Sequence, residues 1–160
     1  LNLYKNFEFN NKFKNIALVH LIKECELRNN ENTNVWSVTN NKGFVLAKDV
    51  FNEKVSSEDT TKYKLILPNT FAYNPSRINV GSIAFNNSEE VGCVSPMYVV
   101  FKISDESLLN SQYLYWLLQS SNFKEQINSF AFGSVRQTVN FVDFCKIIIP
   151  LPKIDEQKRI

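Results

Sequence analysis

Two groups of residues have the types and spacing of catalytic sites, and both have a simpler interpretation. Glu156-Gln157-Lys158 has the Glu-x-Lys spacing of many metal-dependent nucleases, which also need an upstream aspartate to share the metal. The nearest candidate, Asp143, lies in an aromatic segment, and the helix dipole alone favours an acidic residue at a helix start. His20, the sole histidine, lies in an apolar segment and is more typical of a packed or partly exposed side chain than of a general base. We therefore expect no nuclease or nucleophilic centre.

The segment Tyr73-Asn74-Pro75-Ser76 is similar in part to the Asn-Pro-Pro-aromatic motif of amino-methyltransferases. The second proline and the aromatic residue are missing, and no glycine-rich loop follows a strand to hold a cofactor. No zinc site is expected, because Cys25, Cys93 and Cys145 are far apart and form no C-x-x-C pair. Their apolar surroundings favour reduced, buried thiols in a cytoplasmic protein. The sequence thus predicts a chain that has no enzymatic activity, cofactor or metal of its own.

Polar side chains on expected turns suggest a different chemistry, the binding of a nucleic acid. Arg77 follows Asn74 and Pro75 in a turn between strands. A guanidinium there can grip a phosphate or read guanine, and an amide can read adenine. The structural alternative is that Arg77 pairs with a carboxylate and that Tyr73 packs in the core. Net charge does not decide whether the chain binds a nucleic acid, because 18 basic and 16 acidic residues leave a net charge of only +2.

The composition of the chain indicates what kind of fold must hold these residues in place. A chain of 160 residues, 44% hydrophobic and 13% aromatic, fits one domain with an ample core. No apolar run is long enough to cross a bilayer, and the start has no signal-peptide pattern. The first residue is Leu1 rather than Met and the last residues begin a helical pattern, so we expect a fragment or an excised domain.

The hydrophobic pattern predicts both strands and helices. Helical patterns or caps are expected at 16–27, 56–61, 111–129 (a pair of helices) and 140–144, with a new helix opening near 155. Strands are expected at 35–38 and 44–46 around a tight turn at 40–43, and at 63–67, 82–86, 97–103 and 146–149. Pro150 and Pro152 are expected to stop the last strand. This order indicates an α+β domain with a twisted, mostly antiparallel β core flanked by short helices.

Three motifs follow one another between Trp36 and Ile160. Residues 73–83 fit Y-N-P-x-R-I-N-x-G-S-I, residues 92–101 fit G-x-V-S-P-x-Y-x-V-F, and residues 149–160 fit I-P-L-P-x-x-x-E-Q-x-x-I. Together they resemble the target-recognition domain of type I restriction-modification specificity subunits. The resemblance implies that residues 1–150 form the recognition domain and that 151–160 begin a truncated spacer helix.

The resemblance also implies a function. The full subunit of this family carries two such domains, separated by long antiparallel helices, and each domain reads one half of a bipartite DNA target. The expected partners are double-stranded DNA, modification subunits that use S-adenosylmethionine, and restriction subunits that use ATP and Mg²⁺, with no membrane. The alternative is a protein-interaction or scaffold module of the same complex, docking through the helix at 113–118 with little direct DNA contact.

Candidate DNA contacts divide into two roles. Members of this family recognise different sequences, so residues that typify the family would position the DNA backbone rather than distinguish bases. The expected positioning residues are Tyr73, Asn74 and Arg77. Base readout is expected from exposed loops between the motifs, although ordinary solvated turns are the alternative. The readout candidates are Asn40, Asn41, Lys42, Asn86, Asn87, Ser134, Arg136 and Gln137.

Overall fold

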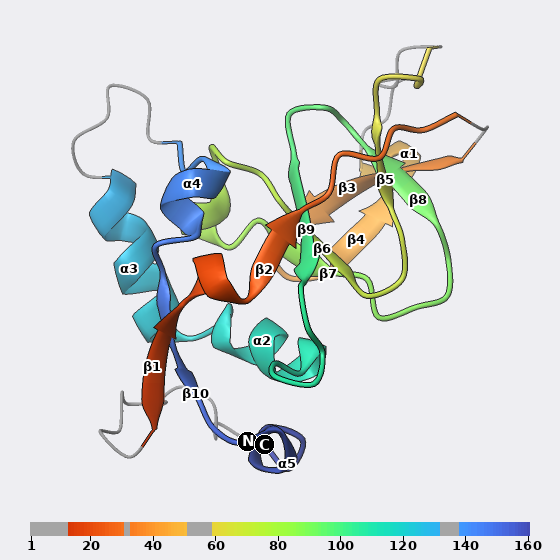
Figure 1. Ribbon diagram of the computed structural model, residues 1–160. Helices are drawn as coiled ribbons and strands as arrows, with labels where there is room; N and C mark the ends of the chain where they lie inside the picture. The colour runs from red at the N-terminus through yellow and green to blue at the C-terminus, as the bar shows by residue number, and fades with distance from the viewer. Residues whose placement is uncertain (1–12, 31–32, 51–58, 132–137) are drawn as a thin grey trace. The chain divides into compact units, whose positions relative to one another are not determined.

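The computed structural model describes residues 13–30, 33–50, 59–131 and 138–160. These residues form two compact units (Figure 1). Unit 1 contains residues 13–23 and 103–160, and unit 2 contains residues 24–102. The chain passes between them within β2 (Ile22–Glu24) and again within β9 (Val99–Ile103). No helix of the described chain is long and apolar enough to cross a membrane.

Two four-stranded sheets provide the framework of unit 2. The first has the order β2-β9-β6-β7, in which β6 is Thr70–Tyr73 and β7 is Ile83–Phe85. The second has the order β4-β3-β8-β5, made of Gly43–Leu46, Asn34–Thr39, Gly92–Val94 and Lys64–Ile66. The pairs β3–β4, β5–β8, β6–β7 and β6–β9 are antiparallel, and β3 runs parallel to β8. Two short helices complete the unit, α1 (Ala47–Val50) and the 3-10 helix η2 (Ile78–Val80).

Aromatic side chains fill the core of unit 2. Phe71 is fully buried and stacks on Phe85 and Phe101, with ring centroids 4.5 and 5.0 Å away. Trp36 on β3 lies 5.3 Å from Phe44, centroid to centroid. It belongs to a cluster of buried residues from both sheets: Trp36, Val38, Ile66, Ala72, Ala84, Val94, Tyr98 and Val100. The large rings supply most of the apolar area that stabilises this small unit.

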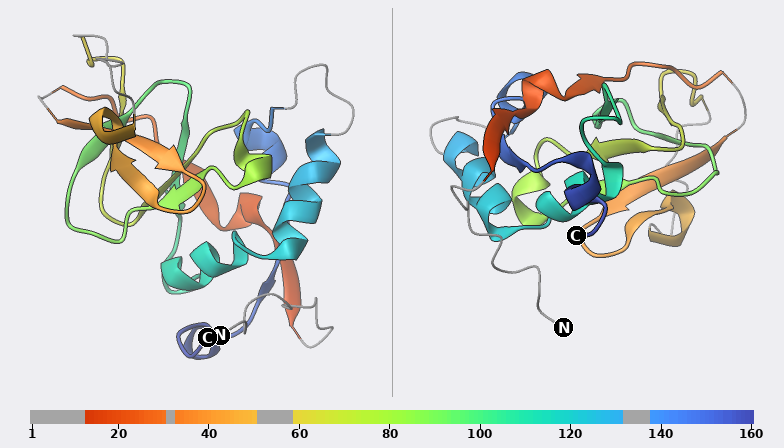
Figure 2. Two further views of the ribbon diagram at one scale, coloured as in Figure 1. Left: turned by 180° about the vertical axis from the view of Figure 1, so that it is seen from behind. Right: turned by 60° about the horizontal axis from the view of Figure 1, so that its bottom comes forward.

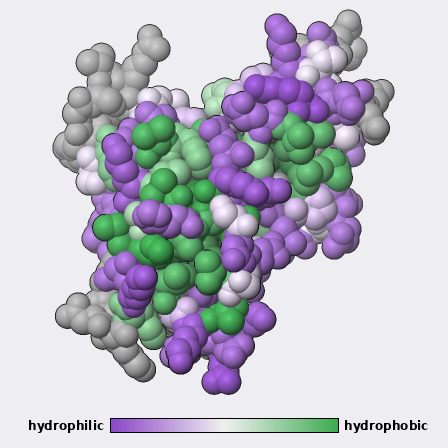
Figure 3. Space-filling model, in the orientation of Figure 1, coloured by the Kyte–Doolittle hydropathy of each residue, from purple (hydrophilic) through white to green (hydrophobic). Residues whose placement is uncertain are grey.

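Unit 1 combines a two-stranded antiparallel sheet with helices. Strand β1 (Lys14–Ala17) pairs with β10 (Ile148–Leu151), and Ile16 lies opposite Ile149. The helices are η1 (Leu18–His20), α2 (Ser111–Leu117), α3 (Ser121–Ala131), α4 (Phe141–Phe144) and α5 (Ile154–Gln157), and α2 and α3 are seen from behind in Figure 2. Apolar side chains also reach the surface over η1 and α4 (Figure 3), where Val19 and Val142 are exposed.

The outer edge of β10 is satisfied by side chains rather than by a further strand. Gln126 of α3 donates to the Ile148 carbonyl and accepts from the Ile148 amide, both at 2.9 Å. The Tyr113 hydroxyl donates to the Pro150 carbonyl at 3.0 Å, and Gln157 Nε2 donates to the Pro152 carbonyl at 2.9 Å. Prolines have no amide hydrogen, so neither Pro150 nor Pro152 leaves an unpaired donor. With its carbonyls already bonded to side chains, this edge is protected against pairing with a further strand.

Tyr113 is expected to make the chain less stable at alkaline pH. Burial, with a smaller contribution from the charge of Glu156, raises the pKa of Tyr113 above its ordinary value of 10.0. A phenol whose pKa is higher in the folded than in the unfolded state stabilises the fold below the unfolded pKa and loses that contribution as pH rises past it. We therefore expect Tyr113→Phe to be less stable than the parent at pH 8, with the gap narrowing above about pH 10. Urea unfolding of both proteins across this range measures the effect, and a gap that stays constant would contradict it.

Most of the predicted elements are confirmed. The β3–β4 hairpin, strands β5, β7 and β9, the helix pair α2–α3, the helical turn α4 with Asn140 as its cap, and the opening of α5 all lie where the sequence placed them. The α+β class with mostly antiparallel sheets is also confirmed. Strand β6 was not predicted, and the predicted extended segment 135–139 falls largely outside the described residues.

Three element predictions are wrong in whole or in part. The expected helix 16–27 is instead β1, η1 and β2, because pairing of Ile16 with β10 outweighs a weak helical pattern. Of the expected helix 56–61, residues 56–58 lie outside the described residues, and Asp59 accepts the Thr61 amide in a turn. The last strand begins two residues late and includes Pro150, which faces the α2 side chain of Tyr113.

Candidate nucleic-acid interface

The β3–β4 turn presents three of the predicted readout residues to solvent. Asn40, Asn41 and Lys42 are all exposed. Thr39 closes the turn below them: its hydroxyl accepts from the Lys42 amide and donates to the Gly43 carbonyl, both at 3.1 Å. Gly43 has a φ of 65°, a left-handed conformation that glycine adopts without strain. The turn is therefore a defined structure that offers two amides and an ammonium group.

The loop between β6 and β7 is equally well ordered. Asn74 Oδ1 accepts from the Ser76 amide at 3.0 Å, and the Asn74 carbonyl accepts from the Arg77 amide at 3.0 Å. The Arg77 carbonyl in turn accepts from the amides of Val80 and Ser82, both at 3.1 Å. Ile78 anchors the loop in the core with 1% of its surface exposed. These bonds hold the backbone of Arg77 while its side chain is exposed.

The turn and the loop lie against each other, although more than thirty residues separate them in the sequence. A Cβ atom on Gly81, which ends the loop at a φ of 93°, would lie 3.7 Å from the Asn40 carbonyl oxygen. A Cβ atom on Gly43 would lie 3.9 Å from the Cβ of Ala84 in β7. The hairpin and the neighbouring β7 can be followed in the left view of Figure 2. The structure thus brings Asn40, Asn41, Lys42 and Arg77 to one end of unit 2, which we call the turn end.

The third predicted loop lies at the opposite end. Tyr73 pairs with Ile83 and Phe71 with Phe85, so the Arg77 loop joins β6 and β7 at one end and Asn86 lies beyond the other. Asn86 is 3% exposed; its Nδ2 donates to the Glu90 carbonyl at 2.9 Å, and its Oδ1 accepts from the Ser88 amide and hydroxyl. Asn86 therefore shapes the loop and has no free amide for a base.

The exposed part of that loop has the wrong charge for a polyanion. Asn87 is exposed, but it is followed by exposed Glu89 and Glu90. Two carboxylates repel phosphates, and an anionic surface slows the approach of a duplex. The loop that carries Asn86 and Asn87 is thus distant from the turn end and chemically unlike it.

Two of the three predicted positioning residues are buried. Tyr73 has 0% of its surface exposed and its ring meets that of Phe101 edge-on at 6.3 Å. Asn74 is 7% exposed and uses its side-chain oxygen within the loop. Both act on the loop that carries Arg77, and their side chains are not offered to a partner. Ser134, Arg136 and Gln137 lie outside the described residues.

Two further exposed cations, Arg28 and Lys62, lie near the start of β3 rather than at the turn end. Lys64, the first residue of β5, pairs with Val94, the last residue of β8, and β8 runs parallel to β3. Thr33, just before β3, donates to Asn29 Oδ1, and the Asn29 amide donates to the Tyr63 carbonyl. Lys62 therefore leaves the sheet beside the start of β3, away from the turn. Arg28 lies beside it, because Arg28 and Lys64 form a β-bridge and Arg28 Nη1 donates to the Lys62 carbonyl at 3.0 Å. The sequence does not reveal this pair, because no local pattern joins residues 34 positions apart.

Arg28 and Lys62, like Lys42 and Arg77 at the turn end, are exposed. Across the part of the chain that the structure describes, the ion pair present joins Lys146 to Asp143 at 2.7 Å, in unit 1. Among the described residues, no carboxylate pairs with Arg28, Lys42, Lys62 or Arg77, and none forms the internal ion pair that was the alternative for Arg77.

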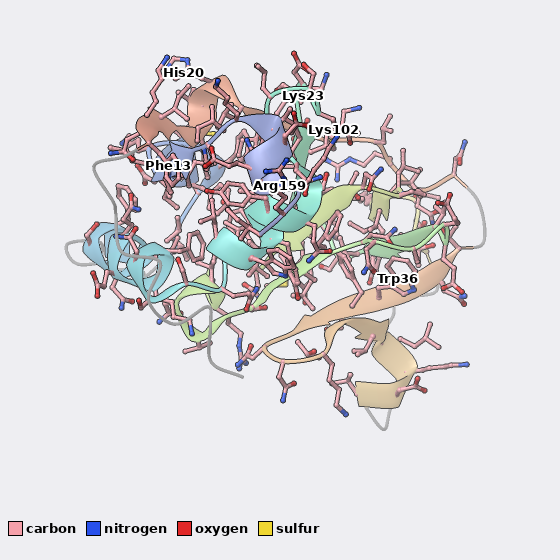
Figure 4. All side chains as sticks on the ribbon, turned by 90° about the horizontal axis from the view of Figure 1, so that it is seen from below. Phe13, His20, Lys23, Trp36, Lys102 and Arg159 are labelled. Carbon is pink, nitrogen blue, oxygen red and sulfur yellow. The ribbon has the colours of Figure 1, made fainter. Side chains whose placement is uncertain are left out.

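The catalytic alternatives find no support in the geometry. Asp143, the candidate metal partner of Glu156, is the carboxylate that pairs with Lys146. Among the described residues, no group of three or more His, Cys, Asp or Glu side chains is placed to hold a metal ion. His20 is exposed at the end of η1 (Figure 4). The three cysteines form no disulfide with one another, and burial raises the pKa of Cys93, which keeps that thiol protonated.

Comparison with known families agrees with the motifs. Residues 8–160 match the model of the type I restriction modification DNA specificity domain. The chain belongs to this family. The family is that of the non-catalytic specificity component of restriction-modification systems. No curated protein matches the chain.

Solved structures show the same fold at low sequence identity. One, described as the structural basis of complex assembly and conformational transition of the type I R-M system, has a TM-score of 0.65 and 16% identity, and covers 96% of this chain and 41% of its own. The S subunit from M. genitalium has a TM-score of 0.58 and 16% identity, with coverage of 96% and 38%. The HsdS subunit from Thermoanaerobacter tengcongensis has a TM-score of 0.56 and 12% identity, with coverage of 95% and 36%. This specificity domain thus spans about two fifths of the solved chains it matches.

Proposed function

We propose that this specificity domain recognises one half of a bipartite DNA target and so directs the methyltransferase and restriction subunits of a type I complex. The observation that carries the proposal is the contact between the β3–β4 turn and the Gly81 end of the Arg77 loop. It gathers amides that can read base edges beside cations that can hold phosphates, on one end of a well-packed unit. In this proposal the protein works in the cytoplasm, where cysteines stay reduced; Cys25, Cys93 and Cys145 form no disulfide with one another.

We assign different roles to the two parts of the turn end. Arg77 is held by backbone hydrogen bonds of a motif that typifies the family, so it would grip the DNA backbone whatever the sequence. Asn40 and Asn41 lie on a turn that belongs to none of the three motifs, so they would contact bases. In the same proposal, residues 151–160, with α5, begin the connection to the rest of the subunit.

The scaffold alternative is less well supported. It would dock a partner through the apolar face of the helix at 113–118, but Tyr113, Leu114, Leu117 and Leu118 are all less than 9% exposed. An apolar face that is already buried has little area to offer a partner. Tyr115 and Trp116 are half-buried and extend the same packing.

The decisive experiment replaces both turn amides in the full-length subunit, assembled with its partners. Selection of duplexes from a random pool first defines the preferred target of the parent. The Asn40→Ala/Asn41→Ala double variant should then lose about 1–3 kcal/mol of discrimination at base pairs of one half-site and keep the other half-site intact. Neither Asn40 nor Asn41 has a positive φ, so alanine fits the backbone at both positions.

Two matched variants complete this experiment. Arg77→Ala should weaken all duplexes alike and flatten the dependence of log K on log salt by about 0.9. Asn87→Ala, at the opposite end of β7, should change neither property. A double variant that retains the full preference, or an Asn87→Ala variant that loses it, would move the readout away from the turn end.

A further inference from the structure

An exposed valine lies on the Arg77 loop at the turn end. Val80 has 52% of its surface exposed, although it ends η2, whose first residue Ile78 is buried in the core. Val80 directly precedes Gly81, the residue at which the loop meets the Asn40 carbonyl oxygen. An apolar side chain that is about half open to solvent therefore lies within one residue of the contact with the β3–β4 turn.

The backbone around Val80 is held on both sides. The Val80 amide donates to the Arg77 carbonyl at 3.1 Å, and the Gly81 amide donates to the Ile78 carbonyl at 3.0 Å. Gly81 has a φ of 93°, a left-handed conformation that ends η2 and directs the chain toward β7. Valine is stiff as well, because its branched Cβ restricts the side-chain rotamers. An apolar group held in this way loses little conformational entropy when it meets a ligand.

The sequence leaves the position of Val80 open within a constrained loop. Val80 occupies the second x of the Y-N-P-x-R-I-N-x-G-S-I motif, whereas its neighbours Asn79 and Gly81 are motif residues. Motif residues such as the buried Ile78 build the loop. A position that the motif does not specify, on a loop that it does specify, is free to differ between domains that read different sequences. Val80 is therefore suited to distinguish targets, in contrast to Arg77.

The chemistry beside the turn amides fits the major-groove edge of an A·T base pair. Adenine offers there an acceptor and a donor that one amide side chain can bind, and thymine offers an acceptor and its C5-methyl group. Asn40 and Asn41 supply exposed amides, and Val80 supplies an exposed apolar group beside them. A cytosine in place of the thymine has no methyl group and presents an amino donor, which valine cannot bind. Amides and a valine on one surface thus complement one A·T pair or two neighbouring pairs.

We propose that Val80 contacts the C5-methyl group of a thymine in the half-site read by the β3–β4 turn, and so helps to determine the recognised sequence. The inference rests on the proposed function and deepens it, because it names a base and the chemical group that is read. The Arg77 carbonyl holds the Val80 amide, so the valine lies at a fixed distance from the proposed phosphate contact. A contact between valine and a methyl group removes apolar surface of both from water, which is favourable.

The test removes the apolar groups from the DNA and from the protein in turn. The full-length subunit in its complex is titrated with duplexes in which each thymine of the preferred half-site is replaced by deoxyuridine, which lacks only the methyl group. One of these replacements should weaken binding to the parent about fourfold, the factor expected for one buried methyl group. In Val80→Ala the same replacement should have little effect, because most of the apolar contact is already lost. Val80→Ile should keep the parent's sensitivity to that methyl group.

Val91→Ala is the matched control. Val91 is another exposed valine of unit 2, with 39% of its surface exposed. It follows Glu90, whose carbonyl accepts from Asn86 in the loop at the opposite end of β7. This variant should respond to every deoxyuridine replacement as the parent does.

The possible failures can be told apart. A parent that binds every deoxyuridine duplex as tightly as the thymine duplex would overturn the inference, and so would a Val80→Ala variant that keeps the parent's sensitivity. If Val80→Ala impaired assembly with the partner subunits and left the methyl sensitivity unchanged, the valine would belong to a protein contact, which also overturns the inference. A parent complex with no sequence preference would instead overturn the proposed function.

Discussion

Replacement of Gly92 by alanine is expected to destabilise the chain by about 2–3 kcal/mol, as overpacking of a core does. Gly92 begins β8 and is buried beneath the indole ring of Trp36. A Cβ atom there would lie 2.3 Å from Cδ2 and 2.4 Å from Cε2 of that ring. Figure 4 shows Trp36 on β3, the strand beside β8. Because Trp36 is 8% exposed and also packs against Phe44, it cannot move aside without opening the core.

A double-mutant cycle tests the cause of this loss. In a Trp36→Leu background the six-membered ring is gone, so Gly92→Ala should cost much less than in the parent. Urea unfolding of the four proteins gives the coupling energy. If alanine costs the same in both backgrounds, the loss comes from backbone conformation in β8 rather than from contact with the indole ring. The first glycine of the G-x-V-S-P motif would then have another role.

The local elements of this fold were largely predictable, because hydrophobic period and turn chemistry act over a few residues. The β3–β4 hairpin follows from its Asn-Asn-Lys-Gly turn, and α4 follows from Asn140, whose side chain caps the Asp143 amide at 2.8 Å. The 16–27 segment failed because its state depends on pairing with β10, more than 120 residues later. Single-sequence patterns carry no information on such a partner.

The candidate site was predictable only in part, for the same reason. Exposure of Asn40, Asn41, Lys42 and Arg77 followed from turn residues, but their meeting at Gly81 depends on the packing of β3 and β4 beside β7. Asn86 has the composition of a readout residue and proves to be a buried loop former. Polar side chains in turns bind their own backbone as readily as a ligand.

Gln157, the glutamine of the I-P-L-P-x-x-x-E-Q motif, is expected to be as important for the stability of the fold as Gly92. Gln157 is 1% exposed and makes three hydrogen bonds within unit 1. Its Oε1 accepts from the Asn110 amide at 2.8 Å, and its Nε2 donates to the carbonyls of Leu108 and Pro152, both at 2.9 Å. Asn110 itself caps α2 by accepting from the Tyr113 amide. One side chain thus ties α5 to the start of α2 and to the end of β10.

Gln157→Ala should therefore lower the free energy of unfolding by about 2–4 kcal/mol, because it leaves buried backbone groups unpaired, each costing about 1–3 kcal/mol when water cannot reach it fully. Gln157→Glu should be nearly as harmful, since a carboxylate cannot donate to two carbonyls and adds a buried charge. Lys158→Ala, one residue further on and exposed, is the control and should change stability by less than about 0.5 kcal/mol. Hydrogen exchange at the Asn110 amide identifies the mechanism: its protection should fall more than global unfolding predicts in Gln157→Ala, whereas the carboxylate of Gln157→Glu can still accept from this amide. Unchanged protection would show that α5 is held to α2 by apolar packing, with Gln157 a bystander.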